Sequence, residues 1–114
     1  MGENMKEWKN LLRDEGFIKV GDFLIELSVD TECPCKDDRV YPTITVYDNK
    51  TGSWYYIDEP FEPVNNYTEA WKQAIKVLTE YVKGKEPRLK VTPKKFAPDD
   101  VIERFAHALK TLKT

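Results

Sequence analysis

Hydrophobic residues recur at helical spacing in three stretches of the chain, and this period predicts three helices. They run from Asn4 to Glu15, from Asn66 to Lys83 and from Pro98 to Leu112. The first two begin with an asparagine followed three residues later by a glutamate, a pattern similar to a capping box. The third begins with Pro98 and two aspartates, which favour the first turn of a helix. We expect the second helix to cover one face of a sheet.

Alternating hydrophobic and polar residues predict four strands between the first two helices. Residues 17–20 and 23–30 flank Gly21-Asp22, and a second hairpin spans Tyr41–Asp58. Its turn is Asn49–Gly52, where Gly52 supplies a positive φ at no steric cost. This turn predicts the pairs Asp48 with Ser53, Tyr47 with Trp54, Val46 with Tyr55, Thr45 with Tyr56, and Ile44 with Ile57.

Directly paired residues share a face of the sheet, so this register divides the hairpin into two sets. The predicted core set is Pro42, Ile44, Val46, Tyr55 and Ile57. The predicted open set is Tyr41, Thr43, Thr45, Tyr47, Trp54 and Tyr56. A slip of one residue would exchange the two sets, so the division depends on the turn.

The resulting fold class is α+β, with an N-terminal helix, a four-stranded and mainly antiparallel sheet, a covering helix and a C-terminal helix. The 114 residues are enough for one domain. Within it we expect a helix-sheet-helix core over residues 1–84, a proline-punctuated connector over 85–97 and the last helix over 98–114.

Charge is unevenly distributed along the chain. Residues 1–82 hold 9 basic and 16 acidic side chains, whereas residues 83–114 hold 9 and 4. The net charge of −2 argues against a general polyanion binder, but the basic second segment is typical of a nucleic-acid contact or a self-association surface.

The open set of aromatic residues predicts a surface on which the bases of a single-stranded nucleic acid stack. Glu26 and Asp30 share this face and count against phosphate binding there. The expected binding residues are Tyr41, Tyr47, Lys50, Trp54, Tyr56, Arg88, Lys90, Lys94 and Lys95. The alternatives are that a helix or a second subunit covers the face, or that the face binds a partner protein.

No catalytic motif is present, so we expect no enzymatic activity and no cofactor. Cys33 and Cys35 could supply half of a zinc site completed by a second chain, although two unpaired thiols in a loop also explain them. His107, the only histidine, is expected to be a surface or packing residue of the last helix.

The hairpin T-I-T-V-Y-D-N-K-T-G-S-W-Y-Y-I-D and the helix N-Y-T-E-A-W-K-Q-A-I-K-V-L resemble the ThermoDBP-related single-stranded DNA-binding proteins of archaea. The resemblance covers most of residues 4–84 and is one of pattern and architecture. It implies a cleft for single strands, base contacts from Tyr47, Trp54 and Tyr56, and assembly through C-terminal helices. A weaker resemblance, from D-N-K-T-G-S-W-Y-Y and the following helix, is to HicB-type antitoxin domains, which bind a partner protein.

The remaining expectations concern origin and location. A single glutamine beside abundant lysine and glutamate is typical of a thermophile. No apolar run is long enough to span a membrane, and residues 1–10 lack the apolar stretch of a secretory signal. We therefore expect a cytoplasmic protein with no membrane partner. We also expect it to form a homo-oligomer through its last helix.

Overall fold

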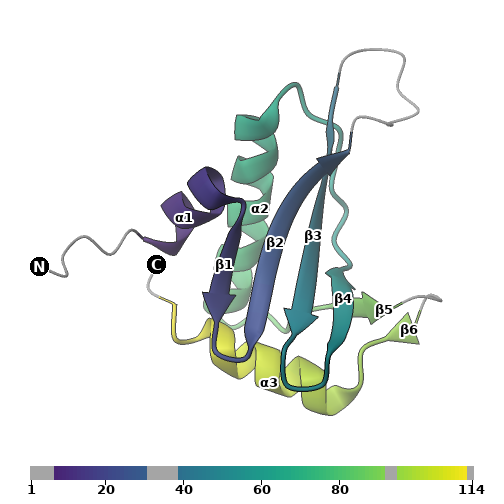
Figure 1. Ribbon diagram of the computed structural model, residues 1–114. Coiled ribbons are helices and arrows are strands. Elements are labelled where there is room, and N and C mark those ends of the chain that lie inside the picture. The colour runs from purple at the N-terminus through teal and green to yellow at the C-terminus, as the bar shows by residue number, and fades with distance from the viewer. Residues whose placement is uncertain (1–6, 31–38, 92–94, 113–114) are drawn as a thin grey trace, which may run out of the picture.

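Helices cover one face of a six-stranded antiparallel sheet, and no helix of the described residues covers the other face (Figure 1). The computed structural model describes residues 7–30, 39–91 and 95–112. Along the chain the elements are α1 (Trp8–Glu15), β1 (Phe17–Val20), β2 (Phe23–Asp30), β3 (Tyr41–Asp48), β4 (Ser53–Ile57), α2 (Tyr67–Val82), β5 (Leu89–Val91), β6 (Lys95–Phe96) and α3 (Asp99–Leu109). The strands lie in the sheet in the same order as in the sequence.

The β3–β4 turn confirms the predicted register. Gly52 has a φ of 79°, and its N–H donates to the carbonyl of Asp48 across 2.8 Å. Tyr47 pairs with Trp54, and the pairs on either side of it also follow the prediction. All five residues of the predicted core set are buried. The turn chemistry and the alternation of the two strands therefore specify the same pairing.

The sheet has six strands, so the prediction of four was incomplete. β5 and β6 lie in the stretch that we predicted to be a connector. Leu89 pairs with Ile57 on β4 and is fully buried, while Lys90 pairs with Tyr56. Strands of three and two residues, separated by a proline, are too short to show an alternating pattern. Their pairing depends on contacts with β4 that are distant in sequence.

Two helix boundaries also differ from the prediction. Asn4 lies outside the described residues, and Glu7 is an extended residue that precedes α1 and makes no side-chain cap. The expected capping box at Glu7 is therefore wrong, and α1 begins at Trp8, the first buried residue among those that the structure describes. The last helix, α3, ends at Leu109. Beyond it the N–H groups of Thr111 and Leu112 donate to carbonyls three residues back, which is the tighter 3₁₀ pattern. In contrast, Asn66 caps α2 as predicted, accepting a hydrogen bond from the N–H of Glu69.

The three helices bury their apolar faces against the same side of the sheet. Leu12 of α1, Leu78 of α2 and Phe105 of α3 are all fully buried in one continuous core. Phe105 meets Phe23 of β2 edge-to-face at 5.2 Å between ring centroids. Most apolar side chains of α3, the helix through which we expected self-association, thus pack within the chain.

A buried ion pair joins α3 to the β3–β4 turn. The side chain of Asp48 is completely buried, and its two oxygens accept from the guanidinium of Arg104 at 2.7 and 3.3 Å. The same carboxylate accepts from the N–H of Lys50 and from the hydroxyl of Thr51, both at 3.0 Å. These hydrogen bonds, that from Arg104 above all, lower the pKa of Asp48.

We predict that Asp48→Asn destabilises the fold by about 2–4 kcal/mol at pH 7, because Arg104 loses its charged partner in a mostly buried position. A carboxylate with a lowered pKa contributes stability above its unfolded pKa and loses that contribution as the pH falls through its folded pKa. The difference from the wild type should therefore be constant between pH 5 and 7 and shrink below about pH 4. Urea denaturation at pH 3, 5 and 7 measures it.

The matched control is Glu86→Gln, which removes a carboxylate from an exposed position. This change should alter the free energy of unfolding by less than about 0.5 kcal/mol. An Asp48→Asn variant that is destabilised equally at pH 3 and pH 7 would contradict the role of the charge.

Candidate nucleic-acid interface

The open face of the sheet is the candidate site. Successive Cα pairs trace a row across all six strands, and none of the helices in the described part of the chain covers this row. Its members, in order from β1 to β6, are Phe17, Glu26, Thr45, Tyr56, Lys90 and Phe96. The large hydrophobic side chains most exposed in the described residues all belong to this face: Phe17, Tyr41, Trp54, Tyr56 and Phe96.

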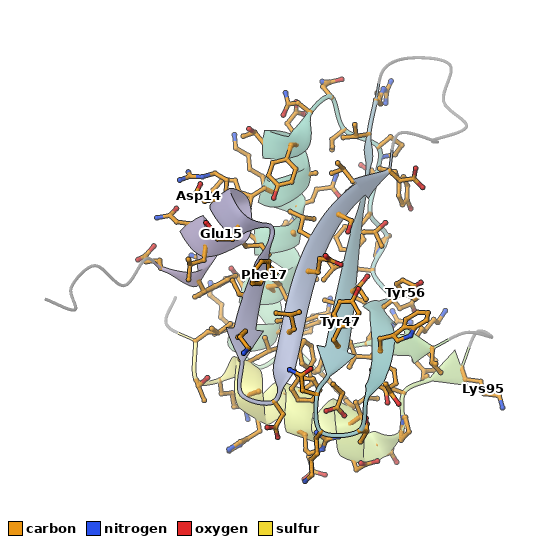
Figure 2. All side chains as sticks on the ribbon, viewed as in Figure 1. Asp14, Glu15, Phe17, Tyr47, Tyr56 and Lys95 are labelled. Atoms are coloured by element: carbon orange, nitrogen blue, oxygen red, sulfur yellow. The ribbon has the colours of Figure 1, made fainter. Side chains whose placement is uncertain are left out.

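Tyr47, Trp54 and Tyr56 form an aromatic cluster on β3 and β4. Tyr47 pairs directly with Trp54, and the rings of Trp54 and Tyr56 meet edge-to-face at 5.2 Å between centroids. The hydroxyl of Tyr47 donates to Oε1 of Glu26 across 3.1 Å. This hydrogen bond to a carboxylate is the main reason that the pKa of Tyr47 is raised. Figure 2 shows Tyr47 and Tyr56 projecting from the sheet on the side opposite α2.

A cationic pair, Arg88 and Lys90, lies next to the aromatic cluster. Lys90 Nζ is 3.2 Å from Oδ2 of Asp58, and a guanidinium nitrogen of Arg88 is 3.4 Å from the same oxygen. Both cations also lie over the ring of Phe96, at 5.4 Å for Lys90 and 5.7 Å for Arg88. Among the described residues one carboxylate, that of Asp58, forms ion pairs with these two positive charges, and both are held beside an exposed ring.

The other predicted site residues are spread more widely. Tyr41 is six residues along β3 from Tyr47, which is about 20 Å in an extended strand. Lys50 is exposed in the β3–β4 turn, near the end of the sheet where Trp54 lies. Lys95 pairs with Val91 and so points to the opposite face from Phe96, at the outer edge of the sheet (Figure 2). Lys94 lies outside the described residues.

Two residues on the open face were missing from the predicted site. Phe96 is 54% exposed, but its strand has only two residues and gave no alternation to place it. Phe17 lies in a predicted strand, and its face follows only from its pairing with Glu26. The useful signal was the predicted face of Glu26, from which the position of Phe17 could have been found.

The remaining polar candidates for a site are Cys33, Cys35 and His107. Cys33 and Cys35 lie outside the described residues, and within those residues no group of three or more metal-ligating side chains occurs. His107 lines a cavity of about 500 Å³ between the β1–β2 turn and α3. Asp22, Asp100 and Arg104 line the same cavity, and Arg104 is already paired with Asp48.

Comparison of the chain with protein-family models, with curated proteins and with solved structures finds no match in any of the three. The resemblances described above therefore stay predictions. In the residues that the structure describes, no helix is both long and apolar enough to cross a membrane.

We predict that Trp54 supplies most of the tryptophan emission that acrylamide can quench. Trp54 is 44% exposed, whereas Trp8 is 6% exposed and the indole N–H of half-buried Trp71 donates to the carbonyl of Lys9. Trp54→Phe should remove most of the accessible emission, and Trp71→Phe should leave it largely intact. Shielding of Trp54 that increases with protein concentration would show that a second copy covers the open face.

Proposed function

We propose that the open face binds single-stranded nucleic acid without catalysis. The observation that supports this most directly is the adjacency of the aromatic cluster and the cationic pair. Tyr56 of the cluster is the direct strand neighbour of Lys90, and Lys90 is the direct neighbour of Phe96. Stacking groups and phosphate-binding groups therefore lie one strand spacing apart, about 5 Å.

The aromatic cluster has the chemistry that base stacking needs. Every base has a π-face, so stacking on an aromatic side chain tolerates any sequence and contributes about 1–3 kcal/mol per base. Trp54 and Tyr56 meet edge-to-face and do not form a parallel stack with each other. Ring surface is therefore left for a ligand, and the exposed side chains of Trp54 and Tyr56 lie where a base can reach them.

The position of the charges indicates how a strand would lie. Arg88 and Lys90 attract phosphates over β5 and β6, whereas Glu26 repels them from β2. The backbone would therefore run along the β5–β6 side, with its bases directed over β4 and β3. Lys50 at the turn would extend the positive side of this path, and Lys95 would reach a backbone that passes the outer edge of β6.

Binding of a fluorescently labelled oligo-dT should be weakened strongly by Trp54→Ala. The expected loss of affinity is about 1–3 kcal/mol, because one stacking ring is removed from the cluster. Fluorescence anisotropy at low salt measures it, and Trp71→Phe is the control, because Trp71 lies on α2 behind the sheet. Absence of oligo-dT binding by the wild type at low salt would refute the proposed function and favour a protein ligand for the open face.

The affinity for oligo-dT should also fall with salt concentration, because phosphate contacts release counterions. Lys90→Ala should weaken binding and reduce the slope of log affinity against log salt by about 1. Lys76→Ala removes an equally charged, exposed residue of α2 and should leave the slope unchanged. Equal slopes for the wild type and Lys90→Ala would show that Lys90 does not contact phosphate.

A further inference from the structure

Glu26 is an acidic group in the middle of a face that otherwise fits a nucleic acid. It lies on β2, and Thr45 separates it from Tyr56 in the row across the sheet. With two strand spacings between them, the Cα atoms of Glu26 and Tyr56 are about 10 Å apart. Thr45 is short and buried, so a base stacked on Tyr56 can extend over it toward Glu26.

The carboxylate of Glu26 is held at the edge of the aromatic cluster. Its Oε1 accepts from the hydroxyl of Tyr47, which is the only hydrogen bond to this side chain found among the described residues. An ionised carboxylate has about four acceptor positions on its two oxygens, so both oxygens can accept further hydrogen bonds. The side chain is half-buried, and the hydrogen bond from Tyr47 restricts its orientation.

The acceptors of Glu26 are complementary to one base edge. Guanine presents two neighbouring donors there, N1–H and the 2-amino group, which match the two oxygens of a carboxylate. Adenine and cytosine each present one amino donor beside a ring-nitrogen acceptor, and thymine presents one donor between two carbonyl acceptors. Bases in single strands are commonly recognised by hydrogen bonds to this edge while their rings stack.

We infer that Glu26 is a specificity residue of the open face, accepting two hydrogen bonds from the Watson–Crick edge of a guanine that stacks on the aromatic cluster. Tyr47 is then a positioning residue that orients the carboxylate. This inference rests on the proposed function and adds a preferred base at one position to binding that is otherwise tolerant of sequence. It also gives a role to the negative charge, which contacts a base edge while the phosphates lie over β5 and β6.

The test uses labelled ten-nucleotide oligo-dT strands in which one central thymine is replaced by guanine, hypoxanthine, adenine or cytosine. A single guanine avoids self-association of guanine runs. The wild type should bind the guanine strand about tenfold more tightly than oligo-dT, a typical discrimination for one bidentate contact. The hypoxanthine strand should be intermediate, because this base keeps N1–H and lacks the 2-amino group. The adenine strand controls for the stronger stacking of a purine.

Glu26→Gln keeps the shape of the side chain and removes its charge. It should reduce the guanine-to-thymine affinity ratio to about twofold or less, while oligo-dT itself binds as well or better. Tyr47→Phe keeps the ring and should lower the same ratio in part. Glu80→Gln, on the exposed side of α2, should leave the ratio at its wild-type value.

The outcomes separate the inference from the proposed function. Equal binding of all the strands by the wild type would overturn the inference and leave the proposed function intact. So would an unchanged ratio in a Glu26→Gln variant whose circular dichroism matches that of the wild type. Failure of every strand to bind would overturn both.

Discussion

The carboxylate of Asp48 lies where the β3–β4 turn meets α3. It accepts from Lys50 and Thr51 within the β3–β4 turn, and it pairs with Arg104 of α3. The turn sets the register of the central hairpin, and the register decides which side chains face the helices. The same carboxylate thus ties the position of α3 to the division of the sheet into a core face and an open face. A buried carboxylate is tolerated there because each of its oxygens has hydrogen-bonded partners.

The parts of the fold that the sequence predicts are those in which two local signals agree. The β3–β4 pairing follows from Gly52 in the turn and from alternation in both strands, and α2 follows from its apolar stripe and the Asn66 cap. β5 and β6 show neither signal. Leu89, for example, is recognised as a core residue only through its pairing with Ile57. The aromatic cluster of the candidate site was therefore predictable, whereas the exposure of Phe96 and the alignment of Lys90 with Tyr56 required the tertiary structure.

The open face changes in chemical character from one edge to the other. Phe17 on β1 is exposed and apolar, and Glu26 on β2 is acidic. The aromatic cluster occupies β3 and β4, and the cationic pair with Phe96 occupies the β5–β6 end. A ligand that is negative along one side and carries flat rings with hydrogen-bond donors along the other would match this order. The uneven distribution of charge along the sequence therefore corresponds to an uneven distribution of charge across the sheet.

Arg88 and Lys90 make their contacts with Asp58 and Phe96 within the chain itself. A free lysine or arginine side chain samples many rotamers, and fixing it on a ligand costs about 2 kcal/mol of conformational entropy. In this protein part of that loss occurs during folding, where the ring of Phe96 and the carboxylate of Asp58 restrict both side chains. The two charges are therefore preorganised, so in the proposed complex less of their attraction to a phosphate would be offset by ordering the two side chains.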